Sequence, residues 1–338
     1  MFNKKGIKMK NSLFVKIITL TLAISFVIGL SACTRFVKLD DELEINISVL
    51  NGTTGFGAAK LMSAANNNET TLNYNFSVET DASVITAGLI NGDVDIAALP
   101  TNAASVVYNK TQGGVRVLAL NTLGVLYVVE NGNTITSVND LEGKTVFCPA
   151  QNPAFVMEYV AKLAGVNVTI DTTYAQPAAL MQFVAASPEG TIAVLPEPVL
   201  SVAMSKNANL TTVLDLTAEW GAQTSESQLV QGCIVVRTEF LENHPKEVEE
   251  FLKDYETSVE FVNTNIAETA SLVVELGIYS GAVAVAEKAI PKCNIRFVAG
   301  DEMKNALSGF LAAMESINPS SIGGKMPEDD FYYDYNAK

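Results

Sequence analysis

The sequence has little of what most catalytic and metal sites need. One histidine, four cysteines and one tryptophan occur among 338 residues, and charged residues make up only 17%. A Ser-His-Asp or Cys-His enzyme needs a histidine base, and zinc sites need clustered histidines and cysteines. No such cluster has metal-ligand spacing, and no Gly-x-x-x-x-Gly-Lys-Ser/Thr phosphate-binding loop occurs. The sequence therefore predicts binding without turnover, with no cofactor and no metal.

The N-terminus has the charge and length pattern of a secretory signal peptide. Five lysines up to Lys16 precede an apolar run, Ile17 to Leu30, which is shorter than the roughly 20 residues of a membrane-spanning helix. The run ends in Leu30-Ser31-Ala32-Cys33, which resembles a bacterial lipoprotein box. We expect removal of residues 1–32, lipidation of Cys33 and a tether over residues 33–43. The alternatives are an N-terminal membrane anchor and an incidental cysteine after an ordinary cleavage site.

Basic residues are scarce in the rest of the chain. Removal of residues 1–32 takes away five lysines and no acid, so the formal net charge changes from −15 to −20. A surface this acidic repels nucleic acid and anionic lipid. We therefore expect an extracytoplasmic protein that is anchored by lipid to the outer face of the cell membrane and has a small-molecule ligand.

From Glu44 onward, apolar strands alternate with helices across turns rich in Gly, Pro, Thr or Asn. Such alternation is typical of βαβ units and mostly parallel sheets, and so of an α/β fold. Cys148, Cys233 and Cys293 are far apart in this pattern and are expected to be unbridged core residues. His244 is expected to cap the helix that begins at Pro245. The expected strands are 44–50, 95–99, 115–120, 145–148, 191–195 and 233–237, and the expected helices are 57–65, 102–108, 154–164, 199–204, 245–263, 267–276 and 302–316.

A short internal echo indicates two similar lobes. Residues 95–100, Asp-Ile-Ala-Ala-Leu-Pro, and residues 191–196, Thr-Ile-Ala-Val-Leu-Pro, share four of six positions. Each copy follows a glycine-containing turn, although two buried strands can also resemble each other by coincidence. The stretch 118–129 is expected to be a first crossover and 221–231 the return. The predicted lobes are 44–122 with 228–338 for lobe 1, and 123–227 for lobe 2.

Four strand-to-helix loops are the candidate ligand contacts. Loops at the carboxyl ends of parallel strands bind ligands in open α/β sheets, and helix starts offer unpaired N–H groups to polar or anionic solutes. The residues expected to contact the ligand are Thr53, Thr54, Gly55, Phe56, Thr101, Asn102, Gln151, Asn152 and Glu197 in the loops, and Asn121, Tyr127 and Gln231 between the lobes.

Several of these residues have an ordinary structural alternative. Phe56 can present a stacking face or lie in the core. Thr101 and Asn152 suit N-cap positions. Glu197, held between two prolines, can accept hydrogen bonds from a ligand or cap a helix at the surface. No arginine or lysine falls in the four loops, which disfavours a doubly charged anion and favours a flat, hydrogen-bond-donating heterocycle.

The ordered motifs together resemble the substrate-binding proteins of bacterial ABC importers, in the nitrate, sulfonate, taurine and thiamine-precursor branch. The resemblance covers the whole mature chain. The motifs that carry it are Leu50-Asn51-Gly52-Thr53-Thr54-Gly55, Asn91-Gly92-Asp93-Val94-Asp95-Ile96-Ala97, Leu99-Pro100-Thr101-Asn102, Asp140-Leu141-Glu142-Gly143-Lys144, Leu195-Pro196-Glu197-Pro198 and Gly323-Gly324-Lys325-Met326-Pro327.

This resemblance implies a type II periplasmic-binding-protein fold. Two Rossmann-like lobes with mixed, mostly parallel sheets would be joined by two crossover hinge strands and would close on a solute. It also implies a monomer that serves an ABC permease and its ATPase. Sulfonates, nitrate, taurine, and pyrimidine or vitamin precursors are the solute classes of this branch. The alternatives are an enzyme on the same fold and a surface lipoprotein without a transport role.

Overall fold

A computed structural model describes residues 39–40, 42–225 and 227–335. The chain divides at Asp40 into two units, and every described helix and strand belongs to the unit from Asp41 to Lys338. The predicted signal peptide, Cys33 and most of the tether lie outside the described residues. No described helix combines the length and the apolar character needed to cross a bilayer.

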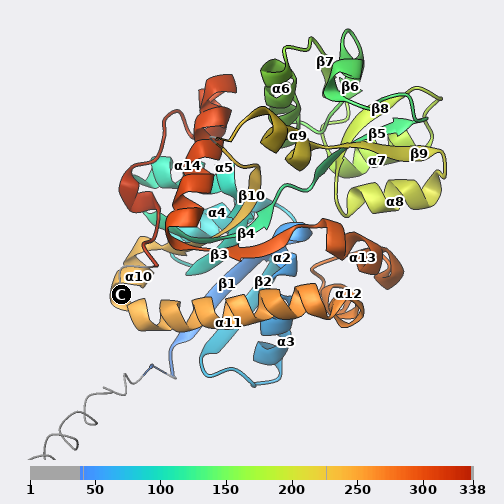
Figure 1. The fold of residues 1–338 in the computed structure, drawn as a ribbon. Helices are drawn as coiled ribbons and strands as arrows, with labels where there is room; N and C mark the ends of the chain where they lie inside the picture. The colour runs from blue at the N-terminus through green and yellow to red at the C-terminus, as the bar shows by residue number, and fades with distance from the viewer. Residues whose placement is uncertain (1–38, 41, 226, 336–338) are drawn as a thin grey trace, which may run out of the picture. The chain divides into compact units, whose positions relative to one another are not determined.

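The first sheet has six strands in the order β11-β4-β10-β3-β1-β2 (Figure 1). β1 pairs in parallel with β2 and β3, whereas β10 runs antiparallel to β3 and β4. We call the body around this sheet lobe 1. Its strands are β1 (Glu44–Leu50), β2 (Asn73–Glu79), β3 (Ile96–Pro100), β4 (Val115–Leu123), β10 (Val230–Arg237) and β11 (Ile295–Val298).

The second sheet has five strands in the order β7-β6-β8-β5-β9. β6 pairs in parallel with β7 and β8, whereas β5 runs antiparallel to β8 and β9. We call the body around it lobe 2. Its strands are β5 (Leu126–Asn131), β6 (Thr145–Phe147), β7 (Thr169–Asp171), β8 (Ile192–Pro196) and β9 (Leu210–Asp215).

The two sheets share one topology if the edge strand β11 is set aside. In each sheet one antiparallel strand lies between two others: β10 between β3 and β4, and β5 between β8 and β9. Each of these strands enters from the other lobe, because β5 follows β4 in the chain and β10 follows β9. β3 and β8, which carry the repeated Ile-Ala-x-Leu-Pro sequence, hold equivalent places. The prediction of two similar lobes with mixed sheets and two crossover strands is therefore confirmed.

Helices cover both sheets. α3, α11 and α12 pack together on one side of lobe 1, α4 and α5 pack together elsewhere on it, and α7 packs against α8 in lobe 2 (Figure 1). The helices are α2 (Thr53–Phe56), α3 (Ala59–Asn66), α4 (Ala82–Asn91), α5 (Thr101–Thr111), α6 (Asn152–Ala164), α7 (Pro177–Ala185), α8 (Val199–Lys206), α9 (Leu216–Gln223), α10 (Thr238–Asn243), α11 (Pro245–Thr264), α12 (Ile266–Glu275), α13 (Val283–Ala289) and α14 (Gly300–Ile317).

Burial follows the sequence period of each element. In β1, Ile45, Ile47 and Val49 are buried while Glu44, Asn46 and Leu50 are more exposed, as expected for a strand with one apolar face, and the polar Ser48 is buried on the other face. In β3 and β8 the first four residues are all buried, which suits central strands covered on both faces. In α11 the buried residues recur at helical spacing along one side.

An apolar contact joins the two lobes beside α14. The ring of Trp220 in α9 lies 5.7 Å from that of Phe310 in α14 and 4.4 Å from that of Tyr159 in α6. Trp220 and Phe310 are both fully buried, and one continuous cluster of buried side chains includes residues of both sheets. The lobes therefore share part of their core along this flank.

Some sequence predictions need correction. The helix expected over 57–65 begins only at Ala59, as α3, and the loop residues Thr53–Phe56 before it form a short helix of their own, α2. The chain turns between them at Gly57, where a Cβ would lie 2.4 Å from the Tyr255 hydroxyl. The stretch 118–129 crosses between the lobes as expected, in the form of two strands that lie in different sheets and are separated at Gly124. His244 takes the N-cap position before Pro245 as expected, but its side chain makes no cap hydrogen bond; its ring lies 4.9 Å from that of Phe240.

Other predictions hold or stay open. Cys148, Cys233 and Cys293 are free and fully buried, as expected. The lobe boundaries after residues 122 and 227 stay predictions, although Gly124 and the described residues 224–225 and 227–229, which belong to no helix or strand, lie where the chain passes between the sheets.

Replacement of Phe310 by alanine should lower the free energy of unfolding by about 3–5 kcal/mol, because it opens a cavity in the core shared by both lobes. Denaturant titration measures this loss. Val283→Ala is the control, since Val283 is 38% exposed, and should change stability by less than about 0.5 kcal/mol. Equal losses in the two variants would contradict a shared core at Phe310.

Candidate functional site

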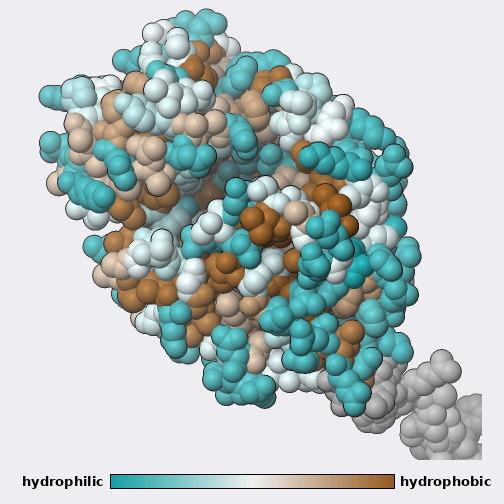
Figure 2. All heavy atoms as spheres, turned by 180° about the vertical axis from the view of Figure 1, so that it is seen from behind, coloured by the Kyte–Doolittle hydropathy of each residue, from teal (hydrophilic) through white to brown (hydrophobic). Residues whose placement is uncertain are grey.

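The surface is hollowed between the two lobes on the face opposite to that of Figure 1 (Figure 2). A cavity of about 440 Å³ is lined by α4 and α5 of lobe 1, by the start of α6 of lobe 2 and by the turn at 318–321. Its polar lining residues are Ser83, Thr86, Asn102, Lys110, Gln151, Asn318, Ser320 and Ser321. Hydroxyl, amide and ammonium groups therefore face the cavity, and no carboxylate is among its lining residues.

The starts of α5 and α6 meet this cavity from opposite lobes. Asn102 and Ala103 of α5 and Gln151 at the start of α6 line it. Neither helix has a side-chain cap or an acidic residue in its first turn. By contrast, α9, α11 and α14 each carry an acidic residue there. The positive ends of the α5 and α6 dipoles are thus left without a carboxylate and favour an electronegative group of a solute.

Gln151 lies in a sparsely populated backbone conformation. Its φ is 65° and its ψ is −125°, a combination that side chains with a Cβ rarely adopt. The predicted cap at Asn152 is wrong, because α6 begins at Asn152 and Gln151 takes the N-cap position. The Asn152 Oδ1 atom is buried and has no hydrogen-bond partner within the described residues. This strain and this unpaired oxygen concentrate where α6 reaches the cavity.

Four predicted contact residues form a floor between the lobes: Thr54, Thr101, Asn121 and Gln231. The Asn121 amide donates to the Thr54 carbonyl at 2.8 Å and to the Tyr255 hydroxyl at 3.2 Å. The Gln231 Oε1 atom accepts the N–H of Val125 at 2.8 Å. Because these polar groups already have protein partners, the residues tie β4, β10 and α2 together in this structure.

Thr101 is a core residue of this floor. It is fully buried, and its hydroxyl donates to the Val230 carbonyl at 3.1 Å. The predicted N-cap role is wrong, because Thr101 is the first residue of α5 and Pro100 takes the cap position. Thr101 therefore fastens α5 to β10.

The first loop, Thr53–Phe56, folds into the short helix α2. Phe56 is fully buried, with its ring edge-on to Tyr279 at 6.2 Å, so the predicted stacking face is wrong. Gly55 is buried against the Leu50 carbonyl, while Thr53 and Thr54 keep partial exposure. The end of the loop is held by Ser258, whose hydroxyl donates to the Gly57 carbonyl at 2.7 Å.

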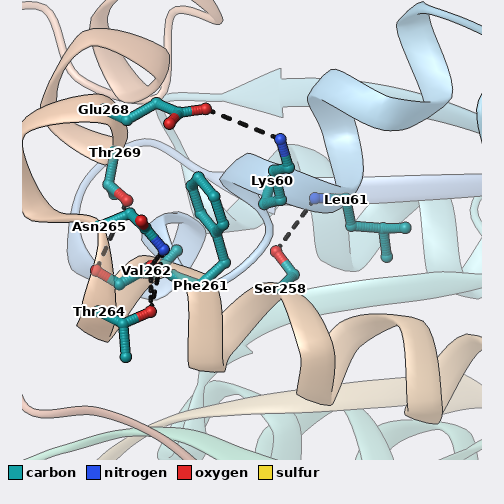
Figure 3. A network of polar contacts seen from close by, with 9 residues as sticks. All are labelled: Lys60, Leu61, Ser258, Phe261, Val262, Thr264, Asn265, Glu268 and Thr269. Atoms are coloured by element: carbon teal, nitrogen blue, oxygen red, sulfur yellow. Dashed lines mark hydrogen bonds and ion pairs between the residues drawn. The ribbon is translucent and has the colours of Figure 1, made fainter.

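Figure 3 shows how α11 and α12 contact α3, the helix that follows the first loop. Ser258 of α11 also accepts the N–H of Leu61 at 3.0 Å. Lys60 lies 3.8 Å from the Glu268 carboxylate and 4.5 Å above the ring of Phe261. The helix that follows the first loop is thus fixed to two later helices.

A second meeting of the lobes contains Glu197 and Tyr127. The Glu197 side chain is fully buried, and its carboxylate accepts the N–H and the hydroxyl of Ser201 at 3.1 and 3.0 Å. It therefore caps α8, but in the interior and not at the surface. Lys292 of lobe 1 lies 3.7 Å from this carboxylate, and its carbonyl accepts the Tyr127 hydroxyl at 3.0 Å. Burial raises the pKa of Glu197, and Ser201 and Lys292 partly oppose that rise.

The structure divides the predicted site residues into three places. Asn102 and Gln151 share the cavity, while Tyr127 and Glu197 lie at the Lys292 contact. Asn152 lies next to Gln151 at the start of α6, and the other seven residues lie in the floor and the first loop, which meet at Thr54. Nothing in the sequence predicted Lys110, Phe155, Lys292 and the turn at 318–321, because these lie on helix faces or far along the chain, where no loop motif marks them.

Three comparisons place the chain among known proteins. Residues 68–268, more than half of the chain, match the family described as NMT1/THI5 like. No curated protein matches the chain. A solved structure of an ABC transporter from Parabacteroides distasonis is 24% identical, with a TM-score of 0.73 over 86% of this chain and 99% of that one.

Two further solved structures are similar at lower identity. The periplasmic aliphatic sulphonate binding protein SsuA from Escherichia coli is 10% identical, with a TM-score of 0.66 over 86% of this chain and 92% of that one. The ligand binding component of an ABC-type import system from Staphylococcus aureus is 14% identical, with a TM-score of 0.62 over 86% of this chain and 96% of that one. These likenesses establish a fold shared with periplasmic binding proteins.

A methyl group at Gly232 should disturb the floor. A Cβ there would lie 2.4 Å from the Asn121 Oδ1 atom and 2.9 Å from Thr122. We expect Gly232→Ala to lower the free energy of unfolding by about 1–3 kcal/mol through overpacking. Gly221→Ala in α9 is the matched control, because a Cβ there meets nothing within 4 Å, and should be neutral or slightly stabilising. Thermal and denaturant unfolding of both variants measure the difference, and an unaffected Gly232→Ala protein would contradict the close packing at Asn121.

Proposed function

The chain belongs to the NMT1/THI5-like family, and on this basis we propose that it is the solute-binding component of an ABC importer. The observation that carries the proposal is the cavity lined from both lobes, with the open ends of α5 and α6 facing it. A solute held there contacts both lobes only when they are close together. It would therefore shift an equilibrium between open and closed forms toward the closed one.

The chemistry of the cavity indicates that the part of the solute held there is small, polar, and neutral or singly negative. Lys110 is the only charged residue among the lining residues, and Phe155, Ile90 and Val106 add apolar surface. A solute with one polar end and a ring or short alkyl part suits this lining. Sulfonate, nitrate or taurine on one side, and pyrimidine or vitamin precursors on the other, remain the two candidate classes.

Binding without turnover fits the residues present. The chain has one histidine, and His244 lies against Phe240 between α10 and α11, outside the cavity lining. Within the part of the chain that the structure describes, no group of three or more His, Cys, Asp or Glu residues is arranged to hold a metal ion. The alternatives, an enzyme on this fold or a surface lipoprotein without transport, differ in outcome: turnover of the bound solute supports the first, and a cavity that takes up no solute supports the second.

The cellular setting of the proposal comes from the N-terminal sequence. Residues 1–32 have the pattern of a secretory signal, and Cys33 follows a lipoprotein box. We infer an extracytoplasmic monomer that is anchored by lipid at Cys33 and delivers its solute to a membrane permease driven by an ATPase. Metabolic labelling with a fatty acid, compared between the natural chain and Cys33→Ala, tests the anchor.

Native mass spectrometry of the mature chain is the decisive experiment. We expect a small molecule to remain bound to the purified protein and to be released chemically unchanged on denaturation. Release of an unchanged molecule distinguishes binding from turnover. Added back to stripped protein, it should raise the melting temperature, since a ligand that binds only the native state stabilises it. A protein that carries and takes up no solute from a sulfonate and pyrimidine panel would contradict the proposal.

Changes at Asn102 and Gln151 should separate solute binding from stability. Asn102→Ala removes an amide from the cavity, and we expect the recovered solute to bind about tenfold more weakly. Gln151→Gly should weaken binding similarly, yet leave the unliganded protein as stable as before or more so, because glycine adopts a φ of 65° freely. Isothermal titration and thermal unfolding measure the two effects. Gln182→Ala, at an exposed position of α7, is the control and should change neither; unchanged affinity in both cavity variants would place the solute elsewhere.

A further inference from the structure

The hydroxyl of Tyr279 is buried and has no hydrogen-bond partner within the described residues. Only 7% of the Tyr279 side chain is exposed. Buried hydroxyl groups in native proteins nearly always find a partner, so an unpaired one needs an explanation. Burial and then the Glu197 charge raise the pKa of Tyr279.

The Glu197 carboxylate accepts two hydrogen bonds, from the N–H and the hydroxyl of Ser201, but none from a cation within the described part of the chain. Its side chain is fully buried, and an isolated buried charge is strongly unfavourable. The Lys292 ammonium lies 3.7 Å away, which is too far for a hydrogen bond, and the Lys292 side chain is 48% exposed. A half-solvated ion pair of this kind holds its partners weakly. Glu197 can therefore accept further N–H donors.

Lys292 belongs to a segment of lobe 1, Tyr279–Asn294, that lies against lobe 2. Within it, α13 packs on α8, and the Lys292 carbonyl accepts the Tyr127 hydroxyl. The amide of Asn294 donates to the Gly124 carbonyl at 2.8 Å, where the chain passes between the sheets. We call Tyr279–Asn294 the strap, because it spans the two lobes beside Glu197.

The strap also adjoins the first loop. The N–H of Gly52 donates to the carbonyl of Ile278 at 2.8 Å, and the rings of Phe56 and Tyr279 meet edge to face. Gly281 lies directly over the Tyr279 ring, since a Cβ at Gly281 would come within 2.3 Å of the hydroxyl. The unpaired hydroxyl and the buried carboxylate thus lie where the first loop, the strap and lobe 2 converge.

We propose that Glu197 and Tyr279 form a solute-recognition site that Lys292 fills in this structure, and that a solute bearing an N–H donor displaces Lys292 from it. The inference rests on the proposed solute-binding function and adds the chemical class of one end of the solute: an amine, amidine or amide. An N–H group satisfies Glu197, and the Tyr279 hydroxyl either donates to a neighbouring acceptor atom or accepts a second N–H. A carboxylate or sulfonate end is disfavoured here, because two like charges in a buried site repel.

Three probes that share one ring test this class: benzamidine, benzamide and benzoate. At millimolar concentration, benzamidine and benzamide should raise the melting temperature of the natural protein and benzoate should not. Glu197→Gln should abolish that preference. Tyr279→Phe should weaken benzamide binding about tenfold, as expected for the loss of one hydrogen bond. Lys292→Met, which removes the competing ammonium and keeps the stem, should strengthen benzamidine binding.

Tyr332→Phe is the matched control. Tyr332 is also buried with an unpaired hydroxyl, but it pairs with β4 beside Lys304 and not at the strap. Its variant should bind all three probes as the natural protein does. Unfolding of each unliganded variant checks its integrity, and if Glu197→Gln does not fold, Tyr279→Phe and Lys292→Met decide between the outcomes.

Several results would overturn the inference. These are equal stabilisation by benzoate and benzamidine, unchanged binding in Tyr279→Phe and Lys292→Met, or a recovered natural solute without any N–H donor. In each of these cases the protein still binds a solute, so its proposed function stands. A protein that takes up neither the probes nor a solute of its own would refute both proposals together.

Discussion

The exchange of one antiparallel strand between the two sheets is the constraint on which the structure depends. β4 ends in lobe 1 and the chain enters lobe 2 as β5; β10 returns from lobe 2 to lie between β3 and β4. Both crossings pass beside Gly124, whose Cα leaves no room for a side chain because Thr217 and Leu229 lie against it. The two crossings therefore join the lobes at this point.

The two flanks of this junction differ in kind. Beside α14, fully buried rings of both lobes pack in one apolar core, and parting them would expose a large apolar area. Beside the strap, the lobes meet through a half-exposed lysine, a tyrosine hydroxyl and an asparagine amide, which water can replace. Opening that separates Glu197 from Lys292 while α14 stays on α6 therefore costs least.

The sequence foretold the fold better than the site, for physical reasons. Strands such as β1 and β3 show their burial in their own residues, and two copies of Ile-Ala-x-Leu-Pro mark equivalent places in two sheets. A site depends on which distant segments meet. Nothing near Glu197 in the sequence indicates that Lys292 lies beside it, and nothing near Asn102 indicates the turn at 318–321.

Local rules also failed where tertiary packing overrode them. Threonine is a good N-cap, yet Thr101 is the first residue of α5, one position after the cap. Its hydroxyl donates to the Val230 carbonyl of β10 and not to the start of its own helix. Phe56 follows a glycine-rich turn, yet its ring is buried against Tyr279 in the contact between loop and strap. In both cases a partner more than 100 residues away decided the position of the side chain.

The placement of acidic residues explains how so acidic a chain can hold a polar or anionic solute. Several outer helices begin with aspartate or glutamate, which neutralises their own dipoles, whereas the starts of α5 and α6 are left open toward the cavity. Glu197, a carboxylate buried at the lobe junction, accepts the N–H and the hydroxyl of Ser201 at the start of α8 and is not among the cavity-lining residues. Negative charge is thus abundant on the outside and absent from the cavity lining, so an electronegative group meets helix N-termini from both lobes without a competing carboxylate. This arrangement needs no arginine. The attraction for the electronegative group weakens when the lobes separate, because each helix N-terminus alone supplies only part of the positive electrostatic potential.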